Sequence, residues 1–240
     1  MLNERKKVKL CIVINTVDDT FLPVILKNIE RISRFSAETK KKVEVKIIVV
    51  KNLNLFSTLK ERVKNNDVSI TYISHVINLA QGRNLGIKMC KTEWVAFIDD
   101  DLLLSKKFLK RLFALFDVLE KNKHMNIVGI SGNAIPYFVA RKENKHLGKF
   151  LLPEFYWLLG CSYYDIKNGN LAIINRLIGS NMIIRRKIFN RIGLFNEKLS
   201  FFHAGKKRTY IGGEDTELSF RIFRENIGLL IYDRKLVTYH

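Results

Sequence analysis

Cysteine, acidic residues and long apolar runs are all in short supply in this sequence of 240 residues. Its three cysteines, Cys11, Cys90 and Cys161, are widely separated and odd in number. Such a set predicts neither a disulfide framework nor a zinc cluster, and it favours a reducing cytosol. No apolar run approaches the length of a membrane helix, about 20 residues. The basic N-terminus leads into a short strand-like stretch, so we expect no secretory signal.

The shortage of acids leaves a large positive charge. Lysine and arginine total 42 against 23 aspartates and glutamates, which gives a formal net charge of +19. This balance favours anionic partners, a class that includes nucleotides, nucleic acid and an anionic membrane face. The basic residues form short clusters, and the sequence has no zinc finger, RRM-like pattern or other nucleic-acid motif, so we expect no nucleic-acid partner.

Short apolar runs alternate with segments of helical periodicity in the first half of the chain. This alternation predicts an α/β protein whose parallel sheet has helices on both faces. Near residue 133 the pattern becomes irregular and aromatic, so we expect one domain with a nucleotide-binding half at 1–132 and a second half at 133–240. The predicted strands are residues 8–14, 43–50, 68–73, 94–98, 127–130, 177–184, 229–232 and 236–239, and the predicted helices are 21–35, 55–63, 81–90, 108–119, 185–191 and 216–226.

The stretch WVAFIDDD at residues 94–101 is the most informative part of the sequence. Its five apolar residues predict a strand buried on both faces, and Asp99, Asp100 and Asp101 follow at once. Three adjacent carboxylates repel one another unless a cation binds them, and Mg²⁺ and Mn²⁺ prefer oxygen ligands. The alternative is that Asp101 or Ser105 only caps the following helix.

A second dense stretch, IGGEDTELSFRI at residues 211–222, combines glycines with acids. Two glycines give a loop whose backbone can approach a ligand closely, and Glu214 and Asp215 then open a helix. A carboxylate here could act as a general base. The alternative is that Asp215 is an ordinary N-cap.

Four stretches in this order resemble glycosyltransferase family 2, whose members have the GT-A fold. They are WVAFIDDD, then GSNMIIRRKIFNRIGLFNE at 179–197, GGEDTELSFRI, and LLIYDRKLVTYH at 229–240, while NLAQGRNLGI at 78–87 is similar to the segment before the metal strand. The resemblance extends from about residue 10 to residue 240 and is weakest at 133–175. It implies a Rossmann-like, mostly parallel central sheet flanked by helices, with a C-terminal acceptor-binding half.

The resemblance also implies a donor site. Asp99 and Asp101 match the two acids of the DxD motif, with Asp99 toward the nucleotide and Asp101 on a metal ion, Mn²⁺ or Mg²⁺, and Asp100 is the variable middle residue. His240 would complete the metal site, although a frayed chain end is the alternative. The other nucleotide-sugar residues that the resemblance implies are Thr16, Asn52 and Arg83, with Asn84 shaping the loop.

Two departures from the family pattern concern the donor. The first strand ends in INT, without the family's proline, and the second ends in Lys51 and Asn52 in place of paired acids. Asn52 could still hydrogen-bond a uracil edge, but the missing acid weakens the inference of uridine.

On the acceptor side, Asp215 matches the family's general base. Gly213, Glu214, His203 and Trp157 are the further acceptor residues that we expect. Trp157 lies in FLLPEFYWLLG at 150–160, for which core packing is the alternative.

The implied activity is metal-dependent transfer of a sugar, with inversion, from a nucleotide-diphospho-sugar to a hydroxyl of a glycan or lipid-linked acceptor. UDP is the favoured nucleotide. We expect a cytoplasmic enzyme, peripheral at the inner face of the membrane, because the positive charge suits an anionic surface. The alternatives are a nucleotidyltransferase with a similar sheet, and a non-catalytic protein that binds sugar nucleotides or nucleic acid.

Overall fold

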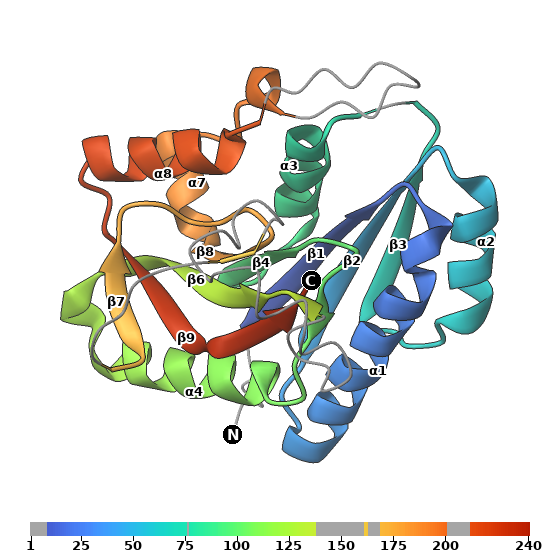
Figure 1. Cartoon of the computed structure of the whole chain (residues 1–240), viewed down its shortest axis with the longest axis horizontal. Coiled ribbons are helices and arrows are strands. Elements are labelled where there is room, and N and C mark those ends of the chain that lie inside the picture. The colour runs from blue at the N-terminus through green and yellow to red at the C-terminus, as the bar shows by residue number, and fades with distance from the viewer. Residues whose placement is uncertain (1–8, 76, 138–160, 163–168, 201–211) are drawn as a thin grey trace, which may run out of the picture.

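The structure is a computed structural model, and it describes residues 9–75, 77–137, 161–162, 169–200 and 212–240. These residues form a mixed α/β fold around one nine-stranded sheet (Figure 1). The strand order is β3-β2-β1-β4-β8-β6-β9-β5, with β7 paired to β9. No helix among the described residues is long and apolar enough to cross a membrane.

The first half of the sheet is parallel. It consists of β1 (Leu10–Thr16), β2 (Val43–Val50), β3 (Val68–Ile73) and β4 (Trp94–Ile98), with β1 between β2 and β4. The predicted strands at 43–50, 68–73 and 94–98 are confirmed to the residue. Every residue of β4 is buried, as its unbroken apolar run predicts. Because these strands are parallel, the polar residues that follow them meet at one edge of the sheet.

The second half of the sheet is mixed. β8 (Asn181–Arg185) is antiparallel to both β4 and β6 (Ile127–Ile135), and β9 (Leu229–Tyr239) is parallel to β6. The short strands β5 (Leu103–Leu104) and β7 (Leu171–Ile174) pair antiparallel with β9.

The two terminal strands predicted at 229–232 and 236–239 are wrong, because one strand, β9, covers both. Its register against β6 shifts between Gly132 and Asn133, whose partners are Asp233 and Val237. The irregularity accommodates the polar residues 234–235 without ending the strand, and β9 therefore carries the chain as far as His240 along the sheet.

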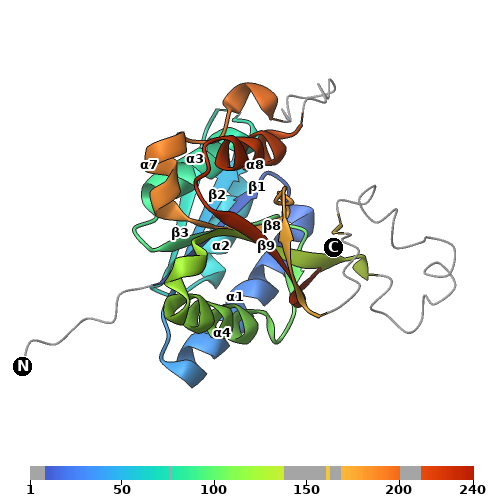
Figure 2. The same ribbon diagram turned by 90° about the vertical axis from the view of Figure 1, so that its left-hand side faces the viewer.

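Helices cover both faces of the sheet (Figures 1 and 2). One face of the sheet is covered by three helices, α1 (Leu22–Thr39), α2 (Leu53–Arg62) and α4 (Phe108–Lys121), which pack against alternate strand residues. The other face is covered by α3 (Leu79–Met89), α7 (Phe189–Ile192) and α8 (Glu214–Arg224). The short 3₁₀ turns are Asp19–Phe21, Lys123–Met125, Arg186–Ile188 and Glu197–Leu199. Residues of β1 alternate strictly between the two cores, as the side-chain period of a strand requires.

Helix α3 lies unusually close to β1. A Cβ atom added at Gly82 would collide with the side chain of Asn15, and one added at Gly86 would collide with Val13. The two glycines let the helix backbone approach the strand, and this contact brings Arg83, between them in sequence, over the end of the sheet.

The same close packing produces a disulfide that the sequence did not predict. Cys11 on β1 and Cys90, which caps the C-terminus of α3, are joined, with a Cα–Cα distance of 6.0 Å. The expectation of no disulfide is therefore wrong, because the fold pairs two cysteines 79 residues apart that no local spacing connects. Cysteine usage consequently gives no support for a reducing compartment. Cys161, the third cysteine, is buried and is not part of this disulfide.

Candidate active site

The three aspartates follow β4 at the edge of the sheet, as expected. The turn closes with a hydrogen bond from the Leu102 amide to the Asp99 carbonyl, and the chain then enters β5. Helix α4 begins only at Phe108, and its N-cap residue, Lys107, makes no side-chain cap. The alternative that Asp101 or Ser105 caps this helix is therefore wrong, and the aspartates need another explanation.

The electrostatics of this cluster disfavour full ionisation. A third of the Asp99 side chain is exposed, but burial of its carboxyl raises the pKa to about 6, against the lowering effect of Arg83 and with a further rise from Asp101. Burial likewise raises the pKa of Asp100 to about 7, although a hydrogen bond with Thr16 opposes the rise. Both carboxyls would be charged more easily beside a cation.

Asp101 is paired with His240. The Nε2 atom of His240 lies 2.9 Å from Oδ2 of Asp101, and Sγ of Cys161 lies 3.7 Å from Nδ1 of the same ring. The hydrogen bond to Asp101, followed by that to Cys161, raises the pKa of His240 to about 10. The His240 backbone is held on both sides, since its amide donates to the Ile135 carbonyl and its carbonyl accepts from the Tyr137 amide. A frayed chain end does not describe this residue.

The donor set at Asp101 suits a hard divalent cation. Oδ1 of Asp101 is buried and has no hydrogen-bond partner among the described residues, so one carboxylate oxygen is available for a ligand. An imidazole nitrogen is an acceptable ligand for Mn²⁺, and Mg²⁺ is commonly held by one or two carboxylates together with substrate phosphates. No group of three or more histidine, cysteine or acidic side chains within the described residues could hold a metal alone. The residues present therefore fit a metal that a phosphorylated ligand helps to bind.

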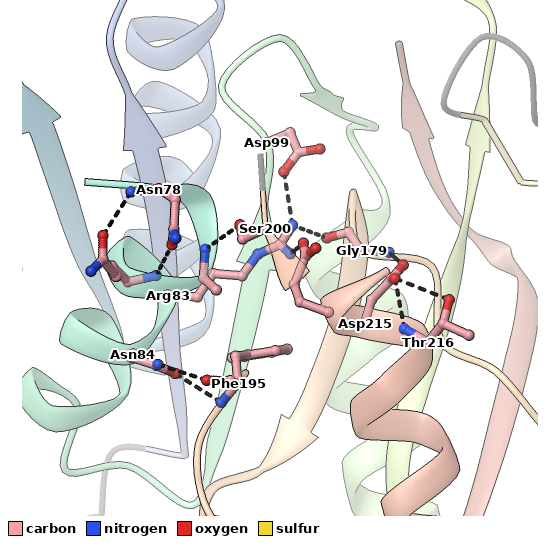
Figure 3. A network of polar contacts seen from close by, with 12 residues as sticks. Asn78, Arg83, Asn84, Asp99, Gly179, Phe195, Ser200, Asp215 and Thr216 are labelled. Carbon is pink, nitrogen blue, oxygen red and sulfur yellow. Dashed lines mark hydrogen bonds and ion pairs between the residues drawn. The ribbon is translucent and has the colours of Figure 1, made fainter. Parts of the chain in front are cut away.

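Arg83 occupies the centre of the site (Figure 3). Its side chain is 2% exposed, and its guanidinium donates to Oε1 of Glu214 at 2.6 Å, to the Gly179 carbonyl at 2.9 Å and to Oδ1 of Asp99 at 3.4 Å. The family resemblance predicts that Arg83 lies beside a nucleotide. In the fold it lies between the aspartate cluster and the acid pair of the second stretch, and protein groups already engage it.

The acid pair opens α8. Gly213 is the N-cap with a φ of 110°, a left-handed conformation that suits glycine, and Glu214 and Asp215 form the first turn. Asp215 therefore is not the N-cap that the alternative described. Its Oδ2 accepts from the Gly179 amide at 2.8 Å, its Oδ1 accepts from the Thr216 amide at 2.7 Å, and Arg176 lies 3.9 Å away.

Glu214 is more deeply held than Asp215. It is 3% exposed, one oxygen pairs with Arg83, and its other oxygen, Oε2, is buried and has no hydrogen-bond partner in the described ranges of the chain. The expected acceptor residue is thus a buried acid whose charge Arg83 balances. The pairing of Arg83 with Glu214 had no signal in the sequence, because 131 residues separate the two.

Asn78, the N-cap of α3, and Asn84 within the helix hold this side of the site in place (Figure 3). Asn78 forms a capping box with Gln81, and its amide also donates to the Glu197 carbonyl. Asn84 exchanges two hydrogen bonds with the backbone of Phe195, at 3.0 and 2.9 Å. The shaping role expected of Asn84 is thus a specific fastening of α3 to the segment that follows α7.

The expected base site lies at the ends of β1 and β2. A cavity of about 420 Å³ is lined by Val17, Val50, Lys51, Asn52, Leu53, Asn54 and Ile77. Asn52 lines it, but Oδ1 of Asn52 caps α2 by accepting from the Leu55 amide at 2.9 Å. Thr16 is buried near Asp100. His203 and Trp157, the remaining expected acceptor residues, lie outside the described residues.

Solved structures with this arrangement define the class of fold. GalNAc-T7, solved with UDP, GalNAc and Mn²⁺, aligns with a TM-score of 0.65 at 15% identity over 99% of this chain and 44% of its own. The mannosyltransferase PcManGT from Pyrobaculum calidifontis, solved with GDP-Man and Mn²⁺, aligns with a TM-score of 0.63 at 11% identity, over 98% of this chain and 57% of its own. TarS 1-349 from S. aureus aligns with a TM-score of 0.62 at 13% identity, over 96% of this chain and 60% of its own. The fold is the GT-A fold, as expected.

The sequence comparison gives the family. The family described as Glycosyl transferase family 2 matches residues 11–193, and the chain belongs to this family. Glucosyl-dolichyl phosphate glucuronosyltransferase of Haloferax volcanii is 24% identical over 213 residues, which are 88% of this chain and 63% of that protein. The chain thus spans less than two thirds of the length of these relatives.

Proposed function

We propose that this chain is a metal-dependent inverting glycosyltransferase that moves a sugar from a nucleotide-diphospho-sugar, UDP-linked, to a hydroxyl of a lipid-linked glycan acceptor. One observation carries the proposal: Arg83 connects the aspartate cluster after β4 directly to the acid pair that opens α8. A donor held at the aspartates and an acceptor held at the acid pair would therefore face each other across a few ångströms.

The donor would occupy the aspartate side. Asp101 and His240 are the residues that would hold Mn²⁺ or Mg²⁺, through Oδ1 and Nε2. When bound, the cation would neutralise the negative charge that develops on the departing diphosphate. Asp99 and Asp100, with Thr16 next to them, would contact the ribose and phosphates, and the cavity that Asn52 lines would receive the base.

The acceptor would occupy the α8 side, with Asp215 as general base. Hydrogen bonds from the Gly179 amide to Oδ2 and from the Thr216 amide and hydroxyl to Oδ1 fix the carboxylate and leave a lone pair of Oδ2 for an acceptor hydroxyl. Within the described part of the chain, no atom lies within 4 Å of the place where a Cβ of residue 213 would be, which would leave room for a substrate. One base and direct attack on the anomeric carbon give inversion.

A lipid-linked acceptor is supported by the relative's name, which specifies a dolichyl phosphate sugar. The net charge of +19 fits an enzyme that works at an anionic membrane face, where such acceptors are held. In this proposal residues 1–132 form the donor half, whose metal site His240 completes, and the rest of residues 133–240 form the acceptor half. Equal binding to neutral and anionic liposomes would refute the membrane part alone.

The test is calorimetric titration with nucleoside diphosphates in the presence of Mn²⁺, Mg²⁺ or EDTA, on the wild type and on Asp101→Asn. We expect UDP to bind only with metal, and the variant to lose this binding. Turnover of UDP-sugars with a polyprenyl-phosphate sugar, followed by NMR of the new anomeric centre, tests transfer and inversion. Release of pyrophosphate from a nucleoside triphosphate, with no diphosphate binding, would instead indicate a nucleotidyltransferase.

A further inference from the structure

Cys161 is a buried side chain that nothing in the reaction above uses, yet it lies against the imidazole of the proposed metal ligand. Its sulfur is 3.7 Å from Nδ1 of His240, while Nε2 of the same ring faces Asp101 at 2.9 Å. The two ring nitrogens thus have different partners on opposite sides. Cys161 itself is 2% exposed, whereas the His240 side chain is 23% exposed, so the sulfur lies on the buried side of the ring.

Both members of this contact are fixed to the same strand end. Ser162, the next residue after Cys161, donates its amide to the Ala134 carbonyl and its hydroxyl to the Gly132 carbonyl, and it accepts from the Ala134 amide. The His240 amide donates to Ile135 of the same strand, β6. Because β6 anchors both backbones, the distance between sulfur and ring is set by the sheet.

We propose that Cys161 is a positioning residue, which accepts a hydrogen bond from Nδ1–H of His240 and thereby holds the imidazole in the tautomer whose Nε2 lone pair points at the metal beside Asp101. A neutral imidazole carries one proton on either nitrogen, and only the form protonated at Nδ1 can bind a metal through Nε2. Metal-binding histidines generally donate their other N–H to an oxygen acceptor that fixes the ring. In this chain a sulfur atom takes that place.

This inference rests on the proposed function, because it assumes that His240 is a metal ligand. Sulfur is a weaker acceptor than a carboxylate or a carbonyl, so we expect its loss to have an effect at the low end of the usual range, about tenfold in metal affinity. Serine can accept the same hydrogen bond and is the conservative replacement. Valine has nearly the shape of cysteine and cannot accept, so Cys161→Val is the informative variant.

The experiment measures Mn²⁺ binding in the presence of inorganic pyrophosphate, by electron paramagnetic resonance of the free ion, for the wild type and for C161V, C161S and H240A. Pyrophosphate supplies the phosphate ligands without depending on which base the enzyme prefers. In parallel, long-range ¹H–¹⁵N spectra of the Mg²⁺-loaded proteins report the tautomer of His240. C161A replaces C161V if valine does not fold, as judged by circular dichroism and thermal melting.

We expect C161V to bind Mn²⁺ about tenfold more weakly and to populate both tautomers, and C161S to stay within about threefold of the wild type with the Nδ1–H form retained. If H240A loses metal binding while C161V keeps wild-type affinity and a single tautomer, the role of Cys161 is refuted and the proposed function stands. If H240A binds Mn²⁺ as the wild type does, the assignment of His240 as a ligand fails, and the inference about Cys161 fails with it.

Discussion

Replacing Arg83 by methionine should be among the most destabilising single changes in this protein. Methionine has a similar length and can fill the space, but it cannot donate to Glu214, which is 3% exposed, or to the Gly179 carbonyl. Removing one partner of a buried ion pair leaves an uncompensated charge and costs about 3–5 kcal/mol. For a chain of this size such a loss lowers the melting temperature by on the order of 10 °C.

The double variant R83M/E214Q separates the charge effect from the loss of packing. Glutamine removes the charge that methionine leaves unpaired, so we expect the double variant to be more stable than the sum of the single changes implies, by about 2 kcal/mol. It should fold and yet show no transfer, because neither Asp99 nor residue 214 keeps its arginine partner. Urea unfolding followed by circular dichroism, without reductant, gives the free energies.

Arg224→Met is the matched control. Arg224 pairs with Glu225 on the surface, where the two side chains are 61% and 44% exposed. Exposed ion pairs of this kind contribute little to the stability of a fold. We expect Arg224→Met to change the free energy of unfolding by no more than about 0.5 kcal/mol. A cost for R83M no larger than that for R224M, or strictly additive effects in R83M and E214Q, would refute the argument that a buried charge pair joins the two halves of the site.

Three further predictions concern stability and metal binding. The pKa of Asp100 is raised in the fold from 3.8 to about 7, so its charged form opposes folding. Asp100→Asn should therefore stabilise the metal-free protein by about 1–2 kcal/mol at pH 8, and this gain in stability should shrink as the pH falls through 7 toward 4. Urea unfolding at several pH values measures this trend. A gain that does not depend on pH would contradict this origin. Mn²⁺ binding should strengthen as the pH rises through about 6 to about 7, where Asp99 and Asp100 lose their protons, and should go on strengthening above pH 7, because His240, with a pKa of about 10, must also lose a proton to bind through Nε2. Calorimetry in buffers of different ionisation enthalpy should detect the protons released, and an affinity that is flat from pH 6 upward would refute this prediction. Reduction of the disulfide between Cys11 and Cys90, which closes a loop of 79 residues, should lower the free energy of unfolding by about 4 kcal/mol, and an unchanged urea midpoint in dithiothreitol would show that the bond adds no stability.

The parallel half of the fold could be predicted from the sequence because each of its strands is a short segment rich in apolar and β-branched residues, bounded by polar segments. β2, β3 and β4 were predicted to the residue for this reason, and the aspartates after β4 had to lie at the carboxyl edge of the sheet. The antiparallel half could not be predicted in the same way. The exposed edge strand β7 is only four residues long and lacks a buried apolar pattern, and β9 continues through polar residues that look like a break.

The candidate site shows the same division. The residues that bring charge, such as Asp101 and Asp215, stand out because carboxylates cluster beside glycines or after a buried strand. The residues that arrange the charge do not stand out: the pairing of Arg83 with Glu214 and the contact of Cys161 with His240 join positions 131 and 79 residues apart. Such contacts follow from how the second half of the sheet returns beside the first, which is a property of the whole fold.

Helix α3 is held in place by interactions of three different kinds, namely the close glycine contacts with β1, the disulfide at its C-terminal end and the hydrogen bonds of Asn84. The segment from Lys51 to Asn54, which lines the cavity, belongs to a different element and shares none of them. If this cavity receives the base, as proposed, substitutions in that segment can change which base is accepted without moving the arginine at the centre of the site. Diversifying residues 51–54 while leaving α3 untouched would then be the way to alter donor preference.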